Sequence, residues 1–382
     1  MKLFPFDEPI SRRGTGSLKW DVKDDELPMW VADQDFPVAD CIVKAVEQRA
    51  AHPVYGYQIT PESWAKAYHD FYLDEFGWDF PVDSIFFATG VVPVLSSSVR
   101  ALSKEGEKVL VLTPCYNIFF NSIVNNRRIP SECEMVLENG TYHIDFADLE
   151  ARMADPDCHL MILCNPQNPL GKIHPKEDLL RIAKLAEKHD VVVLSDEIHG
   201  LISEPKKKYT PYLSLVTKNC LCATSVSKGF NIAGLQSACV ICPDEKIRAK
   251  VERQLNTDEC AEGNVFAYDA AIAACNEGRE YLYDINEAIS RNRSLVKDAL
   301  LPYPNVQLIE QNATYLLWIK VDGTGLSGKE FAERLREETG LYLSSGHVYG
   351  KGGDGFVRMN VACPLPLLEE GISRLVRFIE SL

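Results

Sequence analysis

The sequence has no long hydrophobic run and no excess of positive charge. None of its apolar stretches approaches the roughly 20 residues that a membrane-spanning helix needs. The 382 residues include 40 Lys and Arg against 55 Asp and Glu, which gives a net charge of −15. Such a chain lacks the basic surface that attracts nucleic acid or an anionic membrane, so we expect neither partner. The N-terminal segment 1–16 has no continuous apolar core of the signal-peptide type, and we expect a cytoplasmic protein.

The sequence also lacks the spacing of common metal and redox sites. Its eight histidines form no H-E-x-x-H motif, and its twelve cysteines form a single C-x-x-C, Cys239 to Cys242. That pair lies in an apolar run typical of a strand, where side chains three positions apart point to opposite faces. Scattered cysteines in apolar segments behave as small hydrophobic residues. We therefore expect no metal site.

Short apolar runs alternate with an amphipathic segment through the middle of the chain. Runs of strand length lie at 107–114, 158–166, 190–197, 220–225 and 237–243. Between two of them, segment 175–190 places Leu179, Ile182 and Ala186 at helical spacing, with charges opposite. This alternation predicts an α/β fold in which helices cover both faces of a mostly parallel sheet.

The last hundred residues have a more mixed pattern. The expected elements are a helix around 281–301, a strand at 312–321, a helix with a Ser327–Glu330 capping box, a strand at 355–364 and a closing amphipathic helix. The sequence thus predicts three parts. These are an N-terminal arm packed on the domains (1–35), a large α/β domain (36–280) and a small C-terminal α+β domain (281–382).

Polar and small residues follow the carboxyl ends of the predicted strands, where open α/β sheets bind ligands. Asn165, Asp196 and the segment from Ser225 to Lys228 all fall there. A lysine can form a Schiff base with a carbonyl, and a carboxylate can hold a protonated ring nitrogen, a combination that suggests pyridoxal 5′-phosphate (PLP). Taken singly, a lysine after a strand is more often a solvated surface residue, and such an aspartate often caps a helix.

Other segments fit such a site but also have simpler explanations. Gly90 precedes a helix with Pro93 in its first turn, whose free N–H groups suit a phosphate. Two asparagines in NPQNPLG (165–171) are held by prolines, as in any fixed turn. Arg358 lies within a strand and needs a partner, either an internal carboxylate or that of a substrate. The G-x-G-x-x-G of 350–355 precedes a strand rather than a helix, so we expect a loop closing over the site.

Together these motifs resemble the fold-type I PLP enzymes of the aminotransferase superfamily. More closely, the chain resembles the MalY/PatB branch of cystathionine and cysteine-S-conjugate β-lyases. The segments that carry the resemblance are GSLKWD (16–21), MWVADQDFP (29–37), YGY (55–57), TGVVP (89–93), TPCYNIFF (113–120), CNPQNPLG (164–171), SDEIH (195–199), SKGFNIAGLQ (227–236) and GFVRMNVACP (355–364). They span nearly the whole chain and imply the PLP-transferase fold, PLP as cofactor and a homodimer with shared active sites.

The resemblance also implies a role for each matching residue. Lys228 would hold the cofactor covalently, Asp196 would pair with the ring nitrogen and Asn168 would bind the ring hydroxyl. The other implied cofactor contacts are Tyr116 and His199 at the ring, Gly90, Val91, Val92, Ser225 and Ser227 at the phosphate, and Tyr57 at the phosphate of the neighbouring subunit. Arg358 would bind the substrate carboxylate, and we also expect Asn165 at the substrate.

Three departures from the family pattern lie near the ring and the substrate. Asn117 replaces the second of two adjacent tyrosines, SVSKGF stands where A-P-S-K-T-F is usual, and Gln34 replaces a common methionine. The implied reaction is the β-lyase cleavage of cystathionine or a related cysteine S-conjugate to a thiol, pyruvate and ammonia. The same residues would serve an aminotransferase acting on an L-amino acid. A PLP-binding regulatory protein with little turnover is a third alternative.

Overall fold

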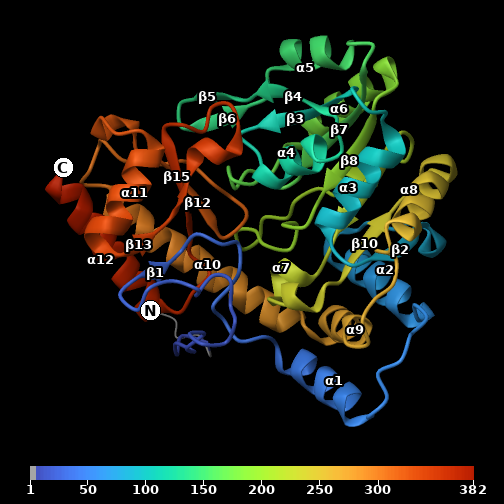
Figure 1. The fold of residues 1–382 in the computed structure, drawn as a ribbon, viewed down its shortest axis with the longest axis horizontal. Coiled ribbons are helices and arrows are strands. Elements are labelled where there is room, and N and C mark those ends of the chain that lie inside the picture. Colours follow the sequence, from blue (N-terminus) through green and yellow to red (C-terminus); the bar gives the residue numbers. More distant parts are fainter. Residues whose placement is uncertain (1–5) are drawn as a thin grey trace.

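The structure is a computed structural model that describes residues 6–382, and a seven-stranded sheet forms the centre of its larger part (Figure 1). In spatial order its strands are β2 (Ile85–Ala88), β10 (Ala238–Ile241), β9 (Cys220–Thr224), β8 (Val192–Asp196), β7 (Cys158–Cys164), β3 (Lys108–Thr113) and β4 (Ile129–Glu134). Strand β10 runs antiparallel to both neighbours, and the other pairs are parallel. The predicted α/β fold with a mostly parallel sheet is confirmed.

Helices cover both faces of this sheet (Figure 1). One face packs against α3 (Val91–Leu102), α4 (Asn117–Val124) and α8 (Glu245–Thr257). The other packs against α2 (Glu62–Phe76), α5 (Phe146–Met153), α6 (Lys176–His189) and α9 (Ala267–Glu277), and α1 (Asp40–Ala51) lies outside this layer against α9 (Figure 1). Because strand side chains alternate, Cys239 lies on the face covered by α2 and α9, and Cys242 lies on the face covered by α3 and α8. Within residues 6–382, no three His, Cys, Asp or Glu side chains are grouped to hold a metal ion.

A second, smaller sheet lies in the C-terminal part of the chain. Its spatial order is β11 (Gln307–Leu308), β12 (Leu316–Lys320), β15 (Phe356–Asn360) and β14 (Ser344–Ser345). The associated helices are α10 (Arg279–Leu300), α11 (Gly328–Thr339) and α12 (Leu365–Ser381), with a separate hairpin of β5 (Val136–Glu138) and β6 (Thr141–His143) in the larger part. The predicted capping box is present, since Ser327 Oγ accepts from Glu330 N at 3.2 Å and Glu330 Oε2 accepts from Ser327 N at 3.0 Å. The predicted boundary between the large and the small domain, between residues 280 and 281, stays a prediction. The seven-stranded sheet precedes it in the sequence and the four-stranded sheet follows it.

The N-terminal arm crosses between the two parts. Strand β1 (Leu27–Pro28) pairs in parallel with β13 (Leu341–Tyr342), and Phe6 packs on Phe36 with 4.8 Å between ring centroids. Residues 1–5 of the predicted arm lie outside the described residues. Of the helices in the described part of the chain, none is long and apolar enough to cross a membrane.

The glycine-rich segment 350–355 is a loop, as predicted, but it does not close over the site. Lys351 N donates to Glu132 Oε2 at 2.9 Å, and Gly352 and Gly355 face a separate acidic hollow beside β4. Gly350 and Gly352 have φ values of 85° and 77°, which glycine adopts without steric cost. This backbone turns the segment towards β4.

Candidate active site

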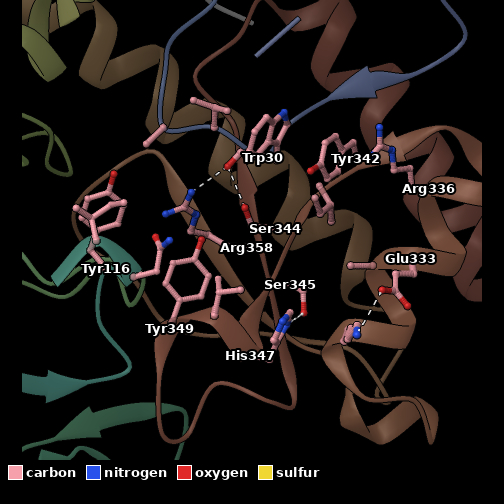
Figure 2. Close-up of a pocket in the computed structure, with 18 of the residues that line it drawn as sticks. Trp30, Tyr116, Glu333, Arg336, Tyr342, Ser344, Ser345, His347, Tyr349 and Arg358 are labelled. Carbon is pink, nitrogen blue, oxygen red and sulfur yellow. Dashed lines mark hydrogen bonds and ion pairs between the residues drawn. The ribbon is translucent and has the colours of Figure 1, made fainter. Parts of the chain in front are cut away.

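Two adjoining cavities open at the carboxyl ends of β7, β8 and β9, and both reach Lys228. The inner cavity, about 180 Å³, is lined by strand-end residues and by the start of α3: Gly90, Val91, Val92, Asn168, Asp196, His199, Ser225 and Ser227. The outer cavity, about 640 Å³, is lined by the arm, α4, α11, β14 and β15 (Figure 2). Ala32, Tyr116 and Lys228 line both, so the amine of Lys228 lies where the two cavities meet.

Lys228 lies on the single-turn helix α7 (Ser227–Phe230), directly after β9. Its Nζ donates to the backbone oxygen of Ala32 at 2.5 Å. Burial is the strongest influence on the pKa of Lys228 and lowers it; Arg358 acts in the same direction, while Asp33 and Asp196 oppose it. A lysine with a lowered pKa loses its proton more readily, and the neutral amine is the form that attacks a carbonyl. Because Lys228 is half-buried, lines both cavities and has its amine on Ala32 O, it is not a solvated surface lysine.

Asp196 ends β8 with its carboxyl group buried in the inner cavity. Burial raises the pKa of Asp196 to about 7, although a hydrogen bond of 3.1 Å from Ile198 N favours the ionised form. A cationic ring nitrogen in the cavity would favour the carboxylate. The neighbouring Glu197 takes no part, because its carboxyl group bonds to Ser195 Oγ at 2.8 Å and Tyr212 N at 2.7 Å. Asp196 is thus the carboxyl group of this pair that faces a ligand.

The other end of the inner cavity is built for an anion. Helix α3 begins there after Gly90, whose extended backbone provides no side-chain cap, so the first N–H groups are free for a ligand. Ser225 Oγ donates to Ser237 O at 2.6 Å and accepts from Ser227 N at 3.0 Å, which gives it a bracing role. Ser237 Oγ lines the cavity, is buried and has no hydrogen-bond partner within residues 6–382. The uncapped helix, the free hydroxyl and Asp196 fit a phosphorylated, basic ring such as PLP.

Sequence reasoning missed Ser237. The residue opens the apolar run 237–243, and a polar residue at the start of a strand carries no pattern of its own. Only the antiparallel insertion of β10 beside β9 brings Ser237 next to Ser225. The order of the strands in space, rather than their sequence, makes this residue part of the site.

Tyr116, Asn168 and His199 surround the middle of the inner cavity. Burial raises the pKa of Tyr116, so its phenol stays protonated. Burial lowers the pKa of His199 to about 3, and the neighbouring Lys228 and Arg358 act in the same direction, so its imidazole stays neutral. Asn168 Oδ1 accepts from Arg358 Nη1 at 3.1 Å, which links the ring end of the cavity to β15.

Arg358 is a buried arginine with neutral partners. Its side chain is 5% exposed, and besides Asn168 it donates from Nη2 to Trp30 O at 2.9 Å (Figure 2). Among the described residues no carboxylate forms an ion pair with Arg358, and its Nε has no partner. A buried guanidinium without a counter-charge is costly unless an anion binds. The internal salt bridge considered for Arg358 is thus absent from the described chain. The other predicted partner of Arg358, the carboxylate of a ligand, fits this site.

Two predicted site residues are not brought to the cavities. Asn165 is fully buried and lines neither cavity; its Nδ2 donates to Thr210 O at 2.9 Å on the far side of β7. Its assignment to the substrate is corrected accordingly, because its side chain braces a loop. Tyr57 lies between α1 and α2 with its side chain wholly exposed, so its contact with a neighbouring subunit stays a prediction.

The outer cavity has an aromatic wall that is fixed from behind. Trp30 and Tyr342 stack with centroids 4.9 Å apart and planes 17° apart, and the Arg336 guanidinium lies 3.8 Å from the Tyr342 ring centre (Figure 2). Arg336 is held in turn by two hydrogen bonds to Glu26, of 2.7 and 2.9 Å. Asn117, in place of the usual tyrosine, lines the same cavity. A side chain that leaves Cα near Lys228 would extend along this wall.

Comparisons with known proteins agree with this geometry. Residues 31–375 match the model of the aminotransferase class I and II family. The cystathionine β-lyase PatB of Bacillus subtilis is 36% identical over 381 residues, covering 97% of this chain and 98% of that protein. Protein MalY of Escherichia coli is 30% identical over 391 residues, covering 99% of this chain and 100% of its own. The solved structure of cystalysin from Treponema denticola, which contains a pyridoxal 5′-phosphate cofactor, superposes with a TM-score of 0.96 at 28% identity and covers 100% of both chains.

The family match and the PatB and MalY likenesses each extend over most of the chain, and the expected fold-type I architecture is confirmed. The chain belongs to the aminotransferase class I and II family, in the branch that contains PatB and MalY.

Proposed function

We propose that this chain is a PLP-dependent carbon–sulfur β-lyase that cleaves cystathionine or a related cysteine S-conjugate to a thiol, pyruvate and ammonia. The observation that carries the proposal is the meeting of Lys228 with two buried groups, Asp196 and Arg358, around two joined cavities. An amine, a carboxyl group and an unpaired guanidinium are what a cofactor aldehyde, a ring nitrogen and a substrate carboxylate require. The similarity to a protein named cystathionine β-lyase supports the choice of reaction.

Each end of the inner cavity has residues to hold PLP. Lys228 Nζ would bond to the cofactor aldehyde, Asp196 would pair with the ring nitrogen, and Asn168 would reach the ring hydroxyl. The start of α3 at Val91 and Val92, with the hydroxyl of Ser237, would bind the phosphate. Bound there, PLP supplies an electron sink for negative charge at the substrate Cα.

The chain's own groups then have separate tasks. Arg358 binds the substrate carboxylate and thereby places Cα beside Lys228, with the leaving group in the outer cavity. Once displaced by the substrate amine, Lys228 accepts the Cα proton at Nζ and becomes an ammonium. Burial lowers the pKa of this amine, which favours the neutral form that can accept a proton. General-base help of this kind contributes roughly a hundred- to ten-thousand-fold in rate.

The segment between α1 and α2 supports a homodimer with shared sites. Val54, Tyr55, Tyr57 and Ile59 are all exposed there, which leaves an unusually apolar strip on an otherwise acidic chain. We propose that a second copy covers this strip and that Tyr57 reaches the phosphate end of the partner's inner cavity. A cytoplasmic location and the domain division at residue 280 belong to the same proposal.

A direct assay separates the lyase from an aminotransferase. The PLP-loaded protein is mixed with L-cystathionine, without a keto acid, and pyruvate is followed by a coupled reduction. We expect continuous pyruvate release from the native protein and none from Lys228→Ala, whose cofactor absorbance should also lack the covalent band. Conversion of the cofactor to its amine form, with no pyruvate, would instead establish transamination; Asn117 in place of a second tyrosine weakens the case for the lyase slightly.

A further inference from the structure

The arm segment 31–35 contacts both ends of the Lys228 residue. At the tip, Lys228 Nζ donates to Ala32 O at 2.5 Å, and Tyr315 OH donates to the same oxygen at 3.2 Å. At the backbone, Gln34 Nε2 donates to Lys228 O. The Gln34 side chain is buried, with 1% exposure. One short stretch of chain therefore holds the reactive lysine by its amine and by its peptide group.

The bond from Gln34 meets a need that α7 creates. A helix of one turn leaves its carbonyl groups without helical partners. The backbone N–H groups of Asn231 and Ile232 both go to Ser227 O, which leaves Lys228 O to a side chain. Asn231 Nδ2 returns the contact by donating to Gln34 O at 3.2 Å and to Phe36 O at 2.7 Å. A methionine at position 34 has no N–H to donate and could not complete this arrangement.

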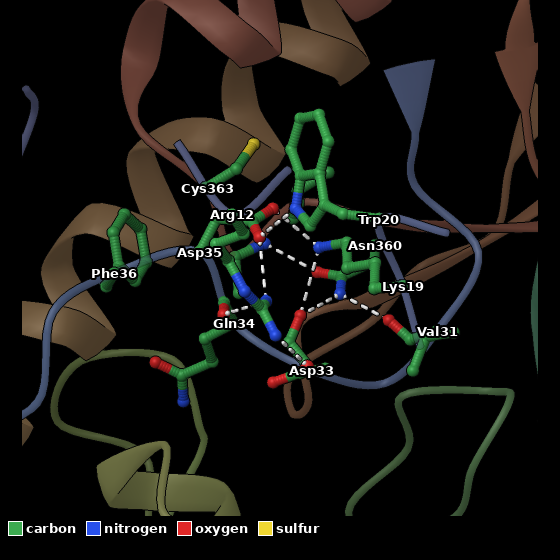
Figure 3. Close-up of polar contacts among 12 residues, drawn as sticks. Arg12, Lys19, Trp20, Val31, Asp33, Gln34, Asp35, Phe36, Asn360 and Cys363 are labelled. Atoms are coloured by element: carbon green, nitrogen blue, oxygen red, sulfur yellow. Dashed lines mark hydrogen bonds and ion pairs between the residues drawn. The ribbon is translucent and has the colours of Figure 1, made fainter. Parts of the chain in front are cut away.

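The arm segment is itself fixed by buried charge (Figure 3). Arg12 donates to Gln34 O and to the Asp35 carboxylate, each at 2.9 Å, and Lys19 binds Asp35 at 2.7 Å. Asn360 Nδ2 donates to the carbonyls of Val31 and Asp33, at 2.6 and 2.7 Å. The segment has no regular structure of its own, so these side chains set the positions of Ala32 O and of the Gln34 amide.

We propose that Gln34 is a positioning residue for Lys228, fixing its peptide group so that the free amine rests on Ala32 O and meets the substrate Cα. The inference rests on the proposed role of Lys228 in proton transfer, but it holds for a lyase and for an aminotransferase alike. Misplacement of a reacting group by 1 Å can cost about a hundredfold in rate. Since Ala32 and Asn231 keep their own contacts, we expect about a tenfold loss without Gln34.

The test compares Gln34→Met and Gln34→Glu with Gln311→Met. The proteins are compared at an alkaline pH, where glutamate keeps the shape of the native side chain but has lost its proton and cannot donate. Gln311 is a control, because its Nε2 also donates to backbone oxygens, those of Leu316 at 2.9 Å and Pro169 at 3.3 Å, and it lines neither cavity. All three variants lose an amide-to-carbonyl hydrogen bond, so a purely structural effect should appear in all three as a similar loss of thermal stability.

The first measurement needs no substrate. PLP is mixed with the cofactor-free protein, and the rise of the covalent absorbance band is followed in a stopped-flow instrument. Both Gln34 variants should form the bond severalfold more slowly than the native protein, and Gln311→Met should not. Equal rates in all four proteins would overturn the proposal. Because no substrate is cleaved, this result stands even if the native protein proves not to be a lyase.

The second measurement separates positioning from binding. With substrate deuterated at Cα, the Gln34 variants should show a lower kcat, a nearly unchanged KM and a larger kinetic isotope effect. A matching rise in Gln311→Met, or native values in Gln34→Glu, would show that the amide donor has no special role and would refute the inference.

Discussion

The buried ion pair of the arm, Lys19 with Asp35, should respond unequally to the loss of its two members. The side chains are 0% and 3% exposed, and Lys19 Nζ lies 2.7 Å from Asp35 Oδ2. Asp35 has two further donors, Arg12 Nη1 at 2.9 Å and Trp20 Nε1 at 2.8 Å (Figure 3). Within residues 6–382, Lys19 Nζ has one other partner, the backbone oxygen of Asp33 at 3.0 Å. The Asp35 carboxylate therefore keeps two donors when Lys19 is removed, whereas the Lys19 ammonium keeps no charged partner among the described residues when Asp35 is removed.

The expected free energies of unfolding follow from this difference. Removing one member of a buried pair costs about 3–5 kcal/mol when the other charge is left uncompensated. Asp35→Asn leaves the Lys19 ammonium in that state and weakens the hold on Arg12, so the full cost of about 3–5 kcal/mol applies. Lys19→Met fills a similar volume and leaves Asp35 with two donors, so we expect about 1.5–3 kcal/mol, the cost of a lost hydrogen bond to a charged group.

Urea unfolding of the cofactor-free proteins, followed by circular dichroism, measures both changes. Lys66→Met is a control, because Lys66 and Asp70 form a pair one helical turn apart whose side chains are 70% and 44% exposed. That substitution should change stability by less than about 0.5 kcal/mol. If Lys19→Met proved as destabilising as Asp35→Asn, the count of remaining partners would not govern the cost, and the reasoning would fail.

Three further predictions concern the site. Because burial raises the pKa of Asp196 from 3.8 to about 7, the folded cofactor-free protein binds a proton that the unfolded chain releases. The free energy of unfolding should therefore fall as the pH rises from about 4 to 7 and change little above that. The urea midpoints at pH 5 and pH 8 should differ less in Asp196→Asn than in the native protein. An equal difference in the two proteins would exclude this carboxyl group as the cause. Arg358→Leu removes two charge-assisted hydrogen bonds to the substrate, about 3 kcal/mol together, so kcat/KM should fall about 150-fold while the covalent cofactor band remains. Mixing Tyr57→Ala subunits with Lys228→Ala subunits should restore about a quarter of the native activity. About half of the dimers then contain one subunit of each kind, and each such dimer has one intact site out of two. No recovery of activity would argue against shared sites.

The strand ends that carry the chemistry were accessible from sequence. Each core strand is a nearly continuous apolar run, and a run that stops at Asp196 or before Lys228 marks the carboxyl edge of the sheet. Arg358 was also identifiable, because an arginine between apolar neighbours in a strand needs an anion. Each of these residues lies in a recognisable local sequence pattern and has a side chain that requires a charged partner, and both properties can be identified from the sequence alone.

The position of Asn165, the presence of Ser237 in the site and the contact of Gln34 depend on geometry that no local pattern encodes. Asn165 follows β7 at the correct edge, but strand alternation turns its side chain to Thr210 and away from the cavities. Ser237 enters the site because β10 is inserted antiparallel beside β9. The contact of Gln34 with Lys228 joins residues 194 positions apart, and the sequence showed only that Gln34 was an unusual residue at its place.

The anchoring of the arm has a consequence for the order in which the chain is made. Residues 6–35 leave the ribosome before the rest of the described chain, yet they are fixed by Leu341, Asn360 and Ala362. The strands of the large sheet end by Ile241 and can pair while synthesis continues. The sheet that positions Lys228 can therefore form during synthesis before the segments that hold Ala32 beside it have been made. A nascent chain stopped at α11 would lack this support for its amine, so catalytic competence should arise only after residue 362 has emerged.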